Sequence, residues 1–248
     1  MLVLAVACGG GREDTPPDGL GPFVPQPTPS VPPLRVLMLT ATTGFRHGSI
    51  ETARQTLTSL GSRTGEFTIT ATEDVSQITA ARLANVDVLA FILTTGELPF
   101  DAGQKAAIVS FVENGGGFIG AHSATDTLYE WADYGRLVGA YFNGHPWSQE
   151  ATVNVEDRDH PATRAFGATF RLNEEYYTFR ENPRSRVHVL LSLDAASVGT
   201  TGDYPLAWSH SFGSGRAFYT ALGHHDATWQ DTRFQTHMRG AINWVGKR

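Results

Sequence analysis

Histidines recur at the ends of the predicted strands. His47 follows the apolar run RVLMLTA, His122 follows FIGA, and His224 follows GRAFYTALG. In open α/β sheets, ligands bind beyond the carboxyl ends of the strands. An imidazole titrates near neutral pH, so it can act as a base, an acid or a metal ligand. The sequence therefore predicts a histidine-rich site at this edge of a sheet.

His122 has the most informative context. It lies in GGGFIGAHSATD, where small neighbours allow a tight turn from a strand into a helix. Such turns expose a side chain at the top of the sheet. We therefore interpret His122 as functional, the alternative being a core histidine whose ring bonds to backbone. Ser123 stands one residue late for a nucleophile elbow, so serine catalysis is the weaker interpretation. The only cysteine is Cys8, near the N-terminus, which excludes cysteine catalysis by the domain.

Two further candidates come from the middle of the chain. His145 lies in FNGHPW, and LNEEYYTF contains the adjacent carboxylates Glu174 and Glu175. Neighbouring strand residues face opposite sides of a sheet, so at most one of the two glutamates can face a given pocket. Imidazole and carboxylate ligands suit zinc, manganese or iron. A divalent metal is therefore a hypothesis, with candidate ligands His122, His145, His224 and Glu175, and with His47 in the wider set. No local histidine spacing supports it.

Candidate substrate-binding residues lie beside these groups. Arg46 could bind a carboxylate or sugar hydroxyls. Aromatic rings could stack on a sugar face or fill a core. The candidate rings are Trp147, Tyr177 and Trp229.

The elements that must position these residues alternate between strand and helix in the first half of the chain. This order predicts an α/β fold with a flavodoxin-like, mostly parallel sheet and helices on both faces. We expect strands at 35–41, 66–74, 87–95 and 118–121, and helices at 49–61, 75–86, 101–116 and 126–142. The second half is richer in strands, with a hairpin around SFGSGRAF, and it closes on an amphipathic helix from residue 233.

The N-terminal region differs in composition. Residues 1–8 are apolar and end at Cys8, which resembles a bacterial lipoprotein signal. Residues 9–33 are rich in proline and glycine and predict a linker, so the folded domain should span 34–248. We therefore expect a lipid-anchored or periplasmic/extracellular protein of the cell envelope, attached to the membrane only through Cys8. The net charge of −6 and the lack of Lys/Arg runs argue against nucleic-acid binding.

Several motifs together resemble the trehalose-utilisation (ThuA-like) family. They are FRHGSI, NGGGFIGAHSATD, FNGHPW, NEEYYTF, PLAWSHSFGSGRAFYTALGH and RGAINW, in order over residues 35–248. The resemblance implies a class I glutamine-amidotransferase-like fold, in which His122 stands where amidotransferases carry their cysteine. Glutamine hydrolysis should therefore be absent. The family's usual Asp-Glu before the tyrosine is Glu174-Glu175 here, which leaves Glu175 as the match.

The resemblance also implies a reaction. The family is associated with breakdown of trehalose and related glycosides beside sugar dehydrogenases that make 3-keto sugars. The expected substrate is thus a 3-keto-glycoside, and the expected partner a sugar dehydrogenase. Acid/base elimination followed by hydration needs a base, an acid and polarisation of the ketone. We expect His122 or Glu175 to be the base, with His47, His145 and His224 as acid, polariser or ligands. The alternatives are a non-catalytic envelope module that binds sugar, and a hydrolase dependent on Ser123.

Overall fold

One sheet forms the centre of the folded unit. The computed structural model describes residues 31–248, and the compact unit runs over Pro32–Arg248. Within it, nine strands hydrogen-bond in the order β2-β1-β3-β4-β9-β8-β7-β5-β6. The strands are β1 (Leu34–Leu39), β2 (Phe67–Thr72), β3 (Val88–Ile92), β4 (Gly117–Ala121), β5 (Phe142–Val155), β6 (Thr169–Phe179), β7 (His188–Leu193), β8 (Pro205–Phe212) and β9 (Gly215–Thr220). The Cys8 signal and all but the end of the linker at 9–33 lie outside the described residues and stay predictions.

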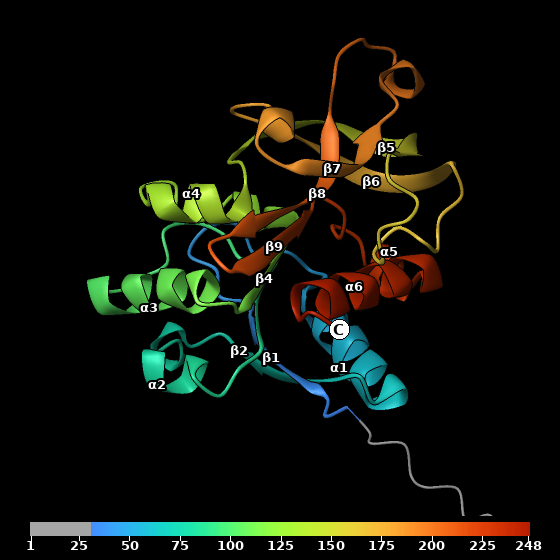
Figure 1. Cartoon of the computed structure of the whole chain (residues 1–248). Helices are drawn as coiled ribbons and strands as arrows, with labels where there is room; N and C mark the ends of the chain where they lie inside the picture. Colours follow the sequence, from blue (N-terminus) through green and yellow to red (C-terminus); the bar gives the residue numbers. More distant parts are fainter. Residues whose placement is uncertain (1–30) are drawn as a thin grey trace, which may run out of the picture. The chain divides into compact units, whose positions relative to one another are not determined.

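The sheet has a parallel core and an antiparallel extension. Strands β2, β1, β3, β4 and β9 pair in parallel, which confirms the predicted architecture for this part. Strands β8, β7, β5 and β6 continue the same sheet with antiparallel pairing. The hairpin expected around SFGSGRAF joins β8 to β9. Figure 1 shows β5, β6 and β7 beyond the parallel strands.

Helices cover both faces of the parallel core. They are α1 (Ile50–Thr64), α2 (Ala80–Leu83), α3 (Ala102–Glu113), α4 (Ala132–Val138), α5 (Asp226–Gln230) and α6 (Thr232–Val245). Helices α1, α5 and α6 pack together on one face, and α2, α3 and α4 lie on the other (Figure 1). Every residue of β3 and β4 is buried. Each fully buried large apolar side chain contributes roughly 1.5–3 kcal/mol, so these central strands hold the strand ends of the site in place. No helix within the described residues has the length and apolar character to cross a membrane.

Local sequence explains where helix α3 begins and where helix α1 ends. Asp101 caps α3 as predicted: its side chain accepts from the Gln104 backbone N–H, and the Gln104 side chain reaches back to the Asp101 N–H. This reciprocal capping box satisfies two otherwise unpaired donors. Helix α1 passes Gly61, where the sequence suggested its end, and stops at Gly65 in a left-handed conformation (φ 68°). Gly61 instead packs against Phe67, where a Cβ would lie 2.5 Å from the carbonyl oxygen.

The predicted helix at 126–142 is much shorter in the structure. Only α4 is helical there, because Leu128 has a positive φ of 56° and its N–H donates to Gly96. Residues from Phe142 onward form β5. The consequence for the site is large, since His145 then lies on a strand beside β6.

Candidate active site

Three histidines from separate strand ends meet over the parallel core. His47 follows β1, His122 begins a short 3₁₀ turn (His122–Thr125) after β4, and His224 follows β9. The ring centroids of His47 and His122 are 4.7 Å apart, and each lies 5.3 Å from that of His224. The three rings therefore meet at the sheet edge where the sequence predicted them.

The β5–β6 hairpin adds a carboxylate and a fourth imidazole. Glu175 Oε2 lies 3.2 Å from His224 Nδ1 and 3.5 Å from His122 Nε2, and Oε1 lies 3.2 Å from His145 Nδ1. A shift in strand register between Gly144 and Trp147 interrupts β5 beside His145. Such irregularities re-aim side chains near active sites. All five residues predicted to be catalytic thus gather around Glu175 or its histidine neighbours.

The geometry of His122 explains why a histidine stands on this turn. Its φ is 52°, a left-handed conformation that is rare for a residue with a side chain. Nδ1 lies 2.8 Å from the carbonyl oxygen of Ala221 and donates to it, and Nε2 lies 2.9 Å from the Tyr177 hydroxyl. The ring is fully buried. The Ala221 carbonyl therefore fixes the orientation of the His122 ring, so that Nε2 points toward the other residues of the site.

Glu174 faces away from the site and anchors a loop. Its fully buried carboxylate accepts from the backbone N–H groups of Gly223 (2.8 Å) and His224 (3.1 Å) and from the Thr228 hydroxyl (2.7 Å). The alternation expected along β6 is confirmed, with one glutamate on each side. Glu174 thereby holds the segment that carries His224.

A small pocket lies over the cluster. Its volume is about 220 Å³, below the roughly 300–1,000 Å³ of sites for drug-sized ligands. The lining comprises Phe45, His47, Asp126, Phe142, His145, Glu175, Tyr177 and His224. His122 lies beneath this surface. A pocket of this size suits a single sugar ring.

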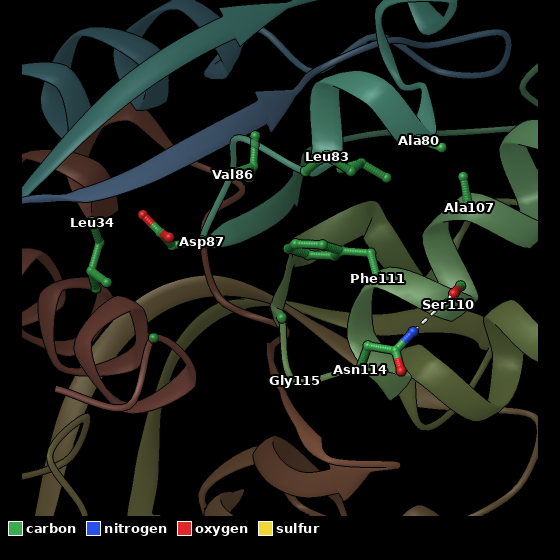
Figure 2. A pocket seen from close by; sticks show the side chains of 13 residues that line it. Leu34, Ala80, Leu83, Val86, Asp87, Ala107, Ser110, Phe111, Asn114 and Gly115 are labelled. Atoms are coloured by element: carbon green, nitrogen blue, oxygen red, sulfur yellow. Dashed lines mark hydrogen bonds between the residues drawn. The ribbon is translucent and has the colours of Figure 1, made fainter.

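Larger hollows occur elsewhere, and one of about 570 Å³ is lined by His160, His188 and His210 but by no carboxylate. Another of about 550 Å³ lies at the opposite, amino-terminal edge of the parallel strands. Figure 2 shows mainly aliphatic side chains there, with Phe111, and with Asn114 bonded to Ser110. Its one carboxylate, Asp87, is paired with Arg35. Size alone therefore does not identify the site.

Burial and contacts within the cluster shift the pKa values of Glu175, His224 and His47. Burial acts to raise the pKa of Glu175, but hydrogen bonds from His122 and His224 outweigh it, so the pKa lies well below its usual range. The hydrogen bond to Glu175 raises the pKa of His224. Burial, with the nearby charges of His122 and His224, lowers the pKa of His47 to about 3. The result is an ionised Glu175 carboxylate beside a neutral His47 imidazole, whose nitrogen lone pair is available to a ligand.

Four of these side chains form a donor set for a cation. One ligand atom from each of His47, His122, Glu175 and His224 lies within 4.8 Å of the others. Three imidazoles and one carboxylate suit zinc, manganese or iron. The set differs from the main expectation, because His47 takes the place of His145, whose Nδ1 lies 3.2 Å from the other Glu175 oxygen, Oε1.

The predicted substrate-binding residues separate into two groups. Tyr177 lines the pocket. Arg46 pairs with Glu73, and Trp147 packs on Tyr204, so neither contributes to the lining. Trp229 is fully buried and its indole N–H donates to the Gly223 carbonyl (2.8 Å). Trp229 thus supports the loop before His224 rather than a sugar.

The hydroxyl of Ser123 is poorly placed for nucleophilic attack. Its side chain is fully buried and lies outside the pocket lining, with Oγ 3.4 Å from His47 Nδ1. The sequence reasoning also missed three lining residues. Asp126 resembles a helix start in the sequence, and Phe45 and Phe142 are the first residues of the motifs FRHGSI and FNGHPW, in which only the later residues were singled out. Phe45 could have been suspected, because it directly precedes Arg46 and His47 at a strand end.

The parallel core, the strand-end site and the antiparallel extension define an α/β protein of the class I glutamine-amidotransferase-like fold. A protein of Thermoplasma acidophilum described as a GMP synthase subunit has this core with 11% identity and a TM-score of 0.53, over 86% of this chain and 94% of that one. The family model for ThuA, described as trehalose utilisation, matches residues 35–245. The chain therefore belongs to the ThuA family.

Solved structures with the ThuA-like description agree with this assignment. A ThuA-like protein of Bacteroides uniformis is 25% identical, with a TM-score of 0.73 over 90% of this chain and 95% of that one. One of Parabacteroides merdae is 18% identical, with a TM-score of 0.70 over 86% and 90%. No curated protein matches the chain.

Proposed function

We propose that this ThuA-family protein is a carbohydrate-processing enzyme that acts on 3-keto-glycosides related to trehalose, by elimination followed by hydration. Membership of a trehalose-utilisation family supports the carbohydrate substrate. The observation that carries the proposal is the contact of Glu175 with three imidazoles at a pocket the size of one sugar ring.

The chemistry matches the groups available. A ketone at C3 acidifies the proton on C2, so a base can remove that proton and the substituent on C1 can leave. Water then adds across the C1–C2 double bond. These steps need proton transfer and polarisation of the ketone but no covalent nucleophile. The buried Ser123 and the location of the only cysteine at Cys8 are consistent with such a route.

We assign proton abstraction at C2 to the pair His145 and Glu175. Glu175 Oε1 holds His145 Nδ1 at 3.2 Å, and no hydrogen bond from residues 31–248 reaches His145 Nε2. The His145 side chain is 49% exposed, so substrate can reach it. His122 is an unsuitable base, because its ring is buried and both nitrogens have partners. It serves instead to hold Glu175 and Tyr177.

The remaining histidines suit polarisation of the ketone. His47 and His224 line the pocket next to Glu175. With His122 and Glu175 they fit a divalent cation, which when bound would supply Lewis-acid stabilisation of the enolate oxygen. The Tyr177 hydroxyl, at 2.9 Å from His122 Nε2, orients that ring at the base of the pocket.

The substrate requires a supplying reaction. We propose that a sugar dehydrogenase oxidises C3 of the glycoside before this chain acts, in line with the resemblance. Attachment at the cell envelope through Cys8 belongs to the same proposal and depends on residues outside the described range.

Turnover of 3-keto-trehalose, compared with trehalose, tests the proposed function. The purified chain is assayed with its metal content measured in parallel. The proposal requires turnover of the keto sugar alone, and its loss in His145→Ala. The matched control is His188→Ala, which removes a histidine paired with Asp157 on another part of the fold. Binding of sugar without turnover would favour the binding-module alternative.

A further inference from the structure

Asp126 is a second carboxylate at the pocket. It ends the turn that begins at His122, and its backbone is fixed on both sides. Its N–H donates to the Ser123 carbonyl, and its carbonyl accepts from the Gly96 N–H, both at 2.8 Å. The half-buried side chain lines the same pocket as Glu175. A substrate in this pocket therefore meets two carboxyl groups.

The two oxygens of Asp126 have different surroundings. Oδ1 accepts a hydrogen bond from the Tyr129 hydroxyl at 2.6 Å, whereas no hydrogen bond from the described residues reaches Oδ2. Arg180 does not neutralise the carboxylate by a salt bridge: its guanidinium lies over the Tyr129 ring, 4.0 Å from the centroid. Tyr129 thus orients Asp126 through one oxygen and leaves the other available to a ligand.

The different surroundings of Asp126 and Glu175 also shift their pKa values in opposite directions. Three imidazoles contact Glu175, and the hydrogen bonds from His122 and His224 hold its pKa well below its usual range. Asp126 has one neutral hydroxyl as its partner, and burial raises its pKa despite the opposing effects of Tyr129 and of the charges on His122, Arg180 and His145. Paired carboxyl groups with contrasting environments take acid and base roles in many enzymes. Asp126 is therefore suited to carry a proton.

We propose that Asp126 is the catalytic residue that gives a proton to the leaving oxygen in the elimination, an inference that rests on the proposed function. The base removes the C2 proton, and that electron pair forms the C1–C2 double bond. The bond from C1 to oxygen breaks with its electrons on oxygen, which takes the Asp126 proton. The products are a free alcohol, an enone and the Asp126 carboxylate.

Hydration restores the enzyme by the reverse proton transfers. The Asp126 carboxylate removes a proton from water as the water oxygen bonds to C1. The protonated base returns a proton to C2, so the net reaction consumes one water and gives a 3-keto sugar and an alcohol. No oxidant, reductant or nucleophilic side chain is needed.

A comparison of two leaving groups tests this role. A sugar alkoxide leaves poorly without a proton, whereas 4-nitrophenolate leaves well without one. In Asp126→Asn we expect kcat for 3-keto-trehalose to fall roughly 10²–10⁴-fold. We expect the 3-keto-glucoside of 4-nitrophenol to lose less than about tenfold, because the acid contributes little to its departure. Asp126→Ser provides a second variant without an acid, and circular dichroism verifies folding of both.

The control is Asp133→Asn, which removes an exposed carboxylate paired with Arg136 and should leave both rates unchanged. Equal losses on the two substrates, or a rise in KM alone, would mean that Asp126 only binds hydroxyls and would overturn the inference. A wild-type protein that turns over neither keto substrate would overturn the proposed function and this inference with it. Wild-type turnover with no leaving-group effect in the variants would overturn only the role of Asp126.

Discussion

Glu174 and Glu175 are adjacent in β6, yet their carboxylates bind different parts of the molecule. Glu174 accepts the N–H groups of Gly223 and His224 in the protein interior. Glu175 contacts His122, His145 and His224 at the pocket. One glutamate thus positions the backbone of His224, and the other contacts its imidazole. Because neighbouring residues of β6 face opposite sides, the strand contacts both the backbone at Gly223 and His224 and the His224 side chain.

Replacing Glu174 should lower the stability of the fold. Glu174→Gln changes a buried side chain that accepts from the backbone N–H groups of Glu175, Gly223 and His224 and from the Thr228 hydroxyl. We expect a loss of roughly 2–3 kcal/mol in the free energy of unfolding, since hydrogen bonds to charged groups are strong and buried donors would remain unpaired. Urea denaturation measures it. The matched control is Glu150→Gln, which removes an exposed partner of Arg171 and should cost no more than about 1 kcal/mol. A similar small loss in both would refute the anchoring role.

The left-handed conformation of His122 can be separated from its imidazole. At most positions Gly is less stable than Ala by roughly 0.5–1 kcal/mol. Because φ is 52° here, we expect His122→Gly to be at least as stable as His122→Ala in urea denaturation. Both variants should lose turnover by roughly 10²–10⁴-fold, since neither can hold Glu175 and Tyr177. A His122→Ala variant that is clearly more stable than His122→Gly would contradict this prediction, because it would mean that the backbone leaves the left-handed conformation when the imidazole is removed.

Phe45 should contribute to substrate binding but not to stability. Its ring is 66% exposed at the pocket mouth, 4.9 Å from the His47 ring. A disaccharide exceeds the 220 Å³ pocket, so its second ring can stack on Phe45. We expect Phe45→Ala to raise KM for 3-keto-trehalose about three- to tenfold, with kcat little changed. Trp147→Phe, at one of the candidate rings from the sequence that lies outside the pocket, should leave KM unchanged. The reverse pattern would place the second sugar near Trp147.

Acid should weaken one ion pair far from the site. The hydrogen bond from Arg239 lowers the pKa of Glu66 from 4.5 to about 2. A depressed folded-state pKa gives stability that is present above the unfolded pKa and is lost as pH falls toward the folded one. The advantage of wild type over Glu66→Gln should therefore be about 1 kcal/mol above pH 4.5, allowing for solvent screening. It should vanish as the pH approaches about 2.

Thermal unfolding across this pH range measures the effect. Glu181→Gln is the control, because its carboxylate is 76% exposed beside Arg186. A wild-type advantage that grows on acidification would contradict the sign of the shift.

Local patterns were enough to predict much of the fold and part of the site. The apolar runs of β1, β3 and β4, the Asp101 cap and the alternation in β6 are local, and the strand-end rule then placed His47, His122 and His224 together. The position of His145 relative to Glu175 depends on how β5 pairs with β6, which no local pattern encodes. Asp126 was hidden because its tight turn resembles a helix start. Trp147 and Trp229 show that an aromatic residue near a histidine does not reveal which side of a strand or loop it faces.

The central proposed role is removal of the proton from C2 of a 3-keto-glycoside by the pair His145 and Glu175. The most direct measurement is hydrogen–deuterium exchange at C2 in D₂O, followed by proton NMR with and without protein. We predict exchange well above the protein-free rate for wild type and loss of that excess in Glu175→Gln, with the Glu150→Gln control unchanged. Exchange at the protein-free rate in wild type, or undiminished exchange in Glu175→Gln, would contradict the account.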